Sequence, residues 1–223
     1  MSTITQEVPP HVSHIRDFDG GEGKTPARLR RYRLGLALFV SSIAMVFVGF
    51  SSAYVVRRGV PSYDTATGAY SLAWEPLQLP IGLLLTNTLL LVGASLAAEF
   101  ARKAERSAYV SSPRRKDFSP SPRWTWASML LALGFITGQI FAWQGLHADG
   151  YLMSSGARTA FFYLITGVHA FHAALGFLLL GWIVFRARLW SLARRYTATD
   201  LTAWYLHSMT TLWIYLFCFL VLA

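Results

Sequence analysis

Three histidines lie within long apolar stretches of the sequence, where polar side chains are costly and therefore informative. His169 and His172 are three residues apart, so a helix would place both imidazoles on one face, and His207 follows in the next apolar stretch. Imidazoles on facing helices are typical ligands of haem or of a metal ion. A haem or metal site is therefore one interpretation of these three residues.

Hydrogen bonding between helices is the second interpretation, and the rest of the sequence favours it. His207 is expected closer to the membrane surface than His169 and His172, which is unsuited to shared haem ligation. The chain has one cysteine, Cys218, so no second thiol is available to complete a metal site. We therefore expect no catalytic, metal-binding or cofactor-binding residue in this chain.

Carboxylates are rare in the apolar part of the sequence. Residues 34–56, 125–146 and 201–223 contain none, and Glu99 is the only one near the apolar residues 81–101. Proton relays and cation sites within membranes are usually built on acidic side chains. The sequence therefore argues against a pump or a secondary transporter that acts alone.

Small and amide side chains indicate close packing of helices. Glycines allow two helices to approach each other, and an amide side chain can hydrogen-bond to a neighbouring helix. We expect Gln139 to form such a bridge, and the adjacent Asn87 and Thr88 to serve packing as well. The glycines concerned are Gly134, Gly138, Gly167, Gly176 and Gly181.

Five apolar helices must position all these residues. Of the 223 residues, 54% are hydrophobic and only 14% are charged, a composition too apolar for a soluble domain. The apolar runs have about 20 residues, the length that a helix needs to cross the hydrocarbon core. Because lipid offers no hydrogen-bond partners, each run should be a helix, and the five should pack as one all-α bundle. The predicted helices are 34–56, 81–101, 125–146, 159–185 and 201–223.

The basic residues sort to one side of these helices. Of the 20 Lys and Arg, six precede the first helix, seven lie between the second and third, and four between the fourth and fifth, leaving three for the other side. Short loops rich in Lys and Arg stay in the cytoplasm. The N-terminus should therefore be cytoplasmic and the C-terminus periplasmic. The net charge of +9 is then explained by the orientation of the chain in the membrane and by attraction to anionic lipid. We therefore expect no nucleic-acid partner.

Two segments outside the helices have the composition of exposed chain. Residues 1–33 are polar and contain Pro-Pro and Gly-Gly pairs, so they are predicted as a flexible cytoplasmic tail, and 34–223 as the transmembrane domain. The basic loop 102–123 has three prolines and is predicted to divide the bundle into a helix pair and a helix triplet. Trp204 and Tyr205 are expected at the membrane interface.

The stretch TAFFYLITGVHAFHAALG, residues 159–176, resembles the signature of subunit III of cytochrome c and quinol oxidases, which belong to the haem–copper oxidases. That signature has an aromatic-rich start, then Thr-Gly-x-His-x-x-His and a glycine four residues later. The matching positions are Thr166, Gly167, His169, His172 and Gly176.

Three further segments resemble the same family in the expected order. The matching residues are Pro80, Asn87 and Thr88 in the second helix, Gly138, Gln139 and Trp143 in the third, and Ala203, Trp204, Tyr205, Leu206, His207, Trp213 and Tyr215 in the last. The resemblance covers about residues 34–223. It points to the five-helix bacterial members, which lack the first two helices of the seven-helix form.

This resemblance implies an accessory role in an aerobic respiratory chain of a bacterial inner membrane. Subunit III of the family holds no redox centre, because haem and copper reside in subunits I and II. It packs on subunit I, binds phospholipid between its helices and supports sustained oxygen reduction and proton uptake. The implied partners are subunits I and II and phospholipids, with a larger respiratory supercomplex as a further assembly; the electron donor is either cytochrome c or quinol.

Two departures from the family pattern weaken a direct role in proton transfer. The closing helix usually has an aspartate three residues after its histidine, where this chain has Thr210. A carboxylate often found near the start of the family's third helix is also missing around Gln78.

Three alternatives remain open on the sequence alone. The first is the related accessory subunit of a nitric oxide reductase, and the second is an independent haem b membrane protein that uses His169 or His172 together with His207. The third is a small carrier, which the absence of buried charge and of Gly/Pro-broken helices disfavours.

Overall fold

The computed structural model describes residues 24–64, 68–71, 79–111, 122–186 and 189–222. Its five long helices are α2 (Lys24–Arg58), α3 (Ile81–Ser111), α4 (Pro122–Ala148), α5 (Ala157–Arg186) and α6 (Leu192–Leu222). Each contains a stretch that is long and apolar enough to cross a membrane. The predicted class, an all-α membrane protein with five transmembrane helices, is confirmed, whereas the sidedness of the two termini stays a prediction.

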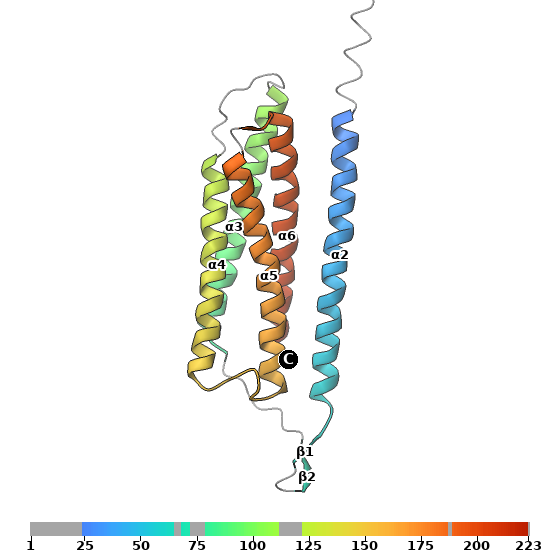
Figure 1. The fold of residues 1–223 in the computed structure, drawn as a ribbon, viewed down its shortest axis with the longest axis vertical. Helices are drawn as coiled ribbons and strands as arrows, with labels where there is room; N and C mark the ends of the chain where they lie inside the picture. The colour runs from blue at the N-terminus through green and yellow to red at the C-terminus, as the bar shows by residue number, and fades with distance from the viewer. Residues whose placement is uncertain (1–23, 65–67, 72–78, 112–121, 187–188, 223) are drawn as a thin grey trace, which may run out of the picture.

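Successive helices run in opposite directions, so α2, α4 and α6 begin at the same end of the molecule (Figure 1). We call this the basic end, because most of the Lys and Arg residues in the described part of the chain lie there. At the other end, β1 (Ser62–Asp64) and β2 (Ala69–Ser71) pair as a short antiparallel hairpin in which Tyr63 faces Tyr70. We call this the hairpin end.

The helices are longer than predicted, chiefly at the basic end. Helix α2 begins at Lys24, so residues 24–33 of the predicted tail are helical, and residues 1–23 lie outside the described part of the chain. Helix α3 continues to Ser111, and α6 begins at Leu192. Hydropathy reports only the part of a helix that crosses hydrocarbon. These extensions carry polar side chains, and contacts between helices hold them.

Helices α3, α4, α5 and α6 form a closed bundle, in which α3 packs on α4 and α6, and α5 packs on the same two helices. The buried residues of α4 recur every three or four positions, which is the spacing of one helix face. They are Thr125, Ser128, Ala132, Phe135, Gln139, Ala142 and Leu146.

The residues that end α4 also follow a known pattern. Gly150 has a positive φ of 85°, and Tyr151 N–H donates to Leu146 O at 2.9 Å, as in a Schellman motif.

Helix α2 stands beside this bundle and packs on α5 and α6 (Figure 1). Its contacts form a ladder of aromatic rings: Phe39 with Tyr205, Phe47 with His169 and His172, and Tyr54 with Phe161 and Phe219. The predicted division into a pair and a triplet of helices is therefore wrong. The second helix joins the last three, because its small and apolar face fits α4 and α6, and the first helix is the one set apart.

Candidate functional site

Several residues of the family motif meet in one cross-section of the four-helix bundle. Trp213 on α6 donates its indole N–H to Thr88 Oγ1 on α3 at 3.0 Å. The Trp213 ring also packs against His169 on α5 and Phe135 on α4, with centroid distances of 4.9 and 5.1 Å. Asn87 lies next to Thr88 and contacts Gly138 on α4. All four helices therefore contribute to this layer, which we call the core layer.

His169 is completely buried in the core layer, and the aromatic rings of Phe47, Phe135 and Trp213 surround it. Neither ring nitrogen has a hydrogen-bond partner in the described part of the chain. The expected hydrogen bond from this histidine to a neighbouring helix is therefore absent there.

The other two histidines point to different surroundings. His172 Nδ1 lies 2.7 Å from Val168 O of its own helix, so the expected bond to another helix is wrong for this residue. His207 bears the expectation out: its Nδ1 lies 2.5 Å from Ser95 Oγ on α3, and its Nε2 lies 3.4 Å from Glu99 Oε2.

The three imidazoles do not converge on one point. His207 precedes Trp213, the neighbour of His169, by six residues, or about 9 Å along a helix. Among the described residues, no three His, Cys, Asp or Glu side chains are grouped so that they could hold a metal ion. The geometry thus gives these histidines separate roles in three local environments.

Two glycines permit the close approach that the sequence predicted. A Cβ atom at Gly138 would collide with the side-chain amide of Asn87, and one at Gly176 would lie 3.1 Å from Leu206 Cδ2. By contrast, a Cβ atom at Gly167 or Gly181 would meet nothing within 4 Å. Gln139, next to Gly138, is fully buried, but its amide has no partner in the described part of the chain, so the predicted bridge is wrong.

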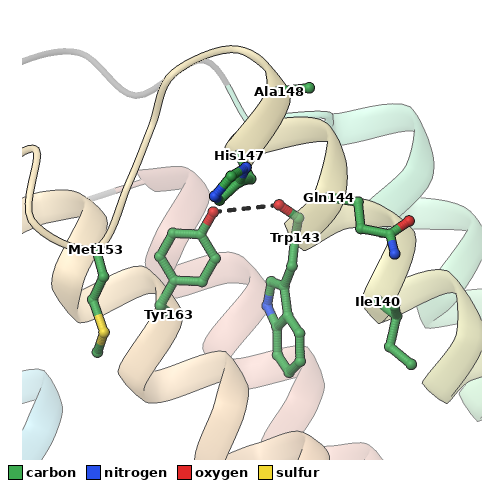
Figure 2. Close-up of a pocket in the computed structure, with 7 residues that line it drawn as sticks. All are labelled: Ile140, Trp143, Gln144, His147, Ala148, Met153 and Tyr163. Atoms are coloured by element: carbon green, nitrogen blue, oxygen red, sulfur yellow. Dashed lines mark hydrogen bonds between the residues drawn. The ribbon is translucent and has the colours of Figure 1, made fainter.

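Trp143 and Thr166 join α4 to α5 near the hairpin end. The indole N–H of Trp143 donates to Thr166 Oγ1 at 3.1 Å, and the Tyr163 hydroxyl donates to Trp143 O at 3.3 Å. Figure 2 shows this second bond at the edge of a pocket of about 570 Å³. The lining residues are Ile140, Trp143, Gln144, His147, Ala148, Met153 and Tyr163. The pocket is mainly apolar, and its polar groups are few.

An ion-pair network at the basic end joins α2, α3 and α6. Asp200 on α6 is fully buried and accepts two hydrogen bonds from Arg33 on α2, at 2.6 and 2.8 Å. Arg102 on α3 lies 3.4 Å from the same carboxylate and forms a two-point pair with Glu99, at 2.6 and 2.7 Å. Glu99 in turn faces His207. Bidentate Arg–carboxylate pairs of this kind fix orientation as well as charge.

A second buried pair supports the extended parts of α3 and α6. Arg195 Nη2 lies 2.5 Å from Glu105 Oε1, and both side chains are largely shielded from solvent. Next to this pair, Tyr109 and Tyr196 stack with a centroid distance of 5.6 Å. These contacts explain why both helices continue past their apolar stretches.

Asp200 and Glu105 were not predicted as contact residues. Asp200 lies one residue before the predicted fifth helix, and Glu105 falls in the predicted loop 102–123, so neither was counted at a helix face. The sequence did contain a signal for the ion-pair network. Arg33, Arg102 and Asp200 all lie at helix ends that the alternating topology brings to the same side of the bundle. Tyr205, predicted at the interface, is instead buried in the bundle and donates its hydroxyl to His172 O at 2.8 Å, whereas Trp204 is exposed and its place at the membrane interface stays a prediction.

Fold and site together define a multi-pass helical membrane protein in which several polar side chains, such as Thr88 with Trp213 and Ser95 with His207, join neighbouring helices. The family model for cytochrome c oxidase subunit III matches residues 15–222. The chain therefore belongs to the cytochrome c oxidase subunit III family. This confirms the resemblance found in the sequence and extends it into the N-terminal segment.

Individual relatives agree with this assignment at a low level of identity. Cytochrome c oxidase subunit 3 of Thermostichus vulcanus is 26% identical over 84% of this chain and 85% of its own length. The probable cytochrome c oxidase subunit 3 of Nocardia farcinica is 26% identical over 82% and 84%. Both relatives are bacterial, in agreement with a bacterial inner membrane as the location.

Proposed function

We propose that this chain is the accessory subunit III of a haem–copper terminal oxidase, packs on subunit I in a complex that also contains subunit II, and supports sustained oxygen reduction. The observation that carries the proposal is the match of the family model over nearly the whole chain. The geometry supports it, because the motif residues Asn87, Thr88, His169 and Trp213 lie in the helix-packing core layer. A role in assembly suits such residues better than a role in redox chemistry.

Purification through a C-terminal tag in mild detergent tests this proposal. We expect a large subunit with haem and copper and a second subunit to co-elute with the chain, with oxygen consumption in the eluate. A reduced-minus-oxidised spectrum and mass spectrometry identify the components. A chain that elutes alone with haem b would contradict the proposal, as would co-elution with a copper-free nitric oxide reductase.

We further propose that the chain binds an anionic phospholipid in a groove between α2 and α6 at the basic end. The groove has a volume of about 850 Å³. The part of the groove nearer the basic end is lined by arginines, and the part farther from it is mainly apolar. The lining residues are Arg30, Arg31, Arg33, Leu34, Leu36, Ala37, Val40, Ser41, Trp204 and Ser208. Arg33 is bound to Asp200 and lies 5.9 Å from the Trp204 ring centre. Arg30 and Arg31 have no ion-pair partner among the described residues, so their guanidinium groups are available for a phosphate.

Replacing Arg30 and Arg31 by glutamine is expected to weaken anionic lipid binding about 30-fold, since each basic residue near a lipid surface contributes about 1 kcal/mol. Lipids that remain bound to the purified complex can be counted by mass spectrometry. The matched control replaces Arg57 and Arg58 by glutamine. This change removes the same amount of charge at the hairpin end. Equal lipid content in the two double variants would argue against the groove.

In this proposal the chain supports proton uptake through structure, not as a proton carrier. Glu99, Glu105 and Asp200 each form an ion pair with an arginine, so all three carboxylates are engaged in structural contacts. Thr210, where the family usually has aspartate, bonds to Leu206 O of its own helix, and Gln78 lies outside the described residues. With the basic end in the cytoplasm, the ion-pair network would steady the region of subunit I where protons enter.

A further inference from the structure

Three amide and imidazole side chains in the core layer have hydrogen-bonding capacity that the described chain does not use. Asn87 on α3, Gln139 on α4 and His169 on α5 are each at least 99% buried. None of their six polar side-chain atoms has a hydrogen-bond partner in the described part of the chain. Buried polar groups in native proteins are normally bonded to protein or to ordered water.

Contacts between the helices place these three side chains at one depth. Asn87 lies beside Thr88, which bonds to Trp213, and the Trp213 ring contacts His169. Gln139 follows Gly138, which touches the Asn87 amide. It is also one helical turn from Phe135, whose ring contacts both Trp213 and His169. The three unpaired groups thus belong to a single layer.

The chemistry of the layer points to a neutral ligand. No carboxylate, Lys or Arg is among the residues that form it, and an uncompensated ion at membrane depth would be costly. Two amides and a neutral imidazole together offer five N–H donors and three acceptor atoms. Direct pairing between the two amides would leave the imidazole unsatisfied, because aromatic rings surround it on the sides of α2, α4 and α6.

We propose that Asn87, Gln139 and His169 form a binding site for internal water inside the α3–α6 bundle. Water has two donors and two acceptors, and buried water in proteins typically bonds to polar groups that are otherwise unsatisfied. Water bound to these three side chains links α3, α4 and α5. The three residues make no direct side-chain hydrogen bond between these helices. The layer is then held by the Thr88–Trp213 bond on one side and by water on the other.

Infrared spectroscopy of the purified complex, prepared in H₂¹⁶O and in H₂¹⁸O, tests this site. Internal water gives narrow O–H stretching bands that shift with the oxygen isotope. We expect at least one such band to be lost in Gln139→Leu and in Asn87→Leu. It should persist in Thr137→Val, an exposed change two residues away on the same helix. The same isotope-sensitive bands in all three variants would overturn the proposal.

A density map of the wild-type complex provides a second test that needs no variant to fold. We expect a peak within about 2.7–3.2 Å of polar atoms from at least two of the three side chains. A map in which the Asn87 and Gln139 amides pair directly, with no peak between them and His169, would overturn the proposal.

Discussion

Replacing Asp200 by asparagine is expected to destabilise the folded chain by about 3 kcal/mol, one of the two largest effects that we anticipate. The carboxylate is fully buried, and it accepts two hydrogen bonds from Arg33 and lies within 3.4 Å of Arg102. Breaking a buried pair by removing one partner costs about 3–5 kcal/mol, because a charge is left uncompensated. The lower value applies here, because Arg33 remains 38% exposed and water can solvate it.

The loss of stability should be largest at α2, because the Arg33–Asp200 pair is the one ion pair between α2 and α6 in the described part of the chain. Denaturant titration of the detergent-purified complex measures the stability, and limited proteolysis near the N-terminus reports release of α2. The matched control is Asp149→Asn, which removes an exposed carboxylate at the hairpin end. If the two variants were equally stable, the ion-pair network would not hold α2.

The existence and order of the five helices could be predicted from the sequence, because the cost of unpaired backbone in lipid leaves few alternatives. Their ends could not. Helix α3 runs ten residues past its predicted end, held by Glu105 and Arg195, which are 90 positions apart in the chain. No local pattern announces such a contact, so hydropathy alone assigned Glu105 to a loop.

The candidate site divides in the same way. The three-residue spacing of His169 and His172 correctly indicated one helix face, since helix geometry fixes it. What each ring contacts depends on the neighbouring helices. Both rings meet Phe47 of α2, whereas Phe135 and Trp213 add their rings only around His169. The same limit applies to Asn87 and Gln139, which were expected to serve helix packing but whose lack of a hydrogen-bond partner among the described residues could not be predicted.

Helix α2 is held at two levels that respond to different conditions. At the basic end, Arg33 pairs with Asp200, and at mid-depth Phe47 packs on the two histidines of α5. Ion pairs weaken with salt when they are partly exposed, whereas ring packing does not. The ion pair and the ring contacts therefore contribute separately to the attachment of α2, and only the ion-pair contribution should depend on salt.

Replacing Gly138 by alanine is expected to destabilise the α3–α4 contact by about 1–3 kcal/mol, the usual cost of adding a methylene group to a full core. At a site with open space, the same substitution would instead stabilise the helix by up to about 1 kcal/mol, because alanine has the higher helix propensity. At Gly138 the new methyl group would overlap with the Asn87 amide, whose short side chain is itself buried and cannot swing into solvent. Denaturant titration of the complex measures the change.

Gly134→Ala is the matched control, because it lies one turn earlier in the same interface, where a Cβ atom would be 3.5 Å from Leu90 Cδ1, an ordinary contact. We expect this variant to be as stable as the wild type or more stable. In the Gly138→Ala background, Asn87→Ala should recover part of the lost stability, since it removes the overlapping atoms, and the double-mutant cycle isolates that term. Equal effects of the two glycine variants, or no recovery, would show that Asn87 does not set the spacing of α3 and α4.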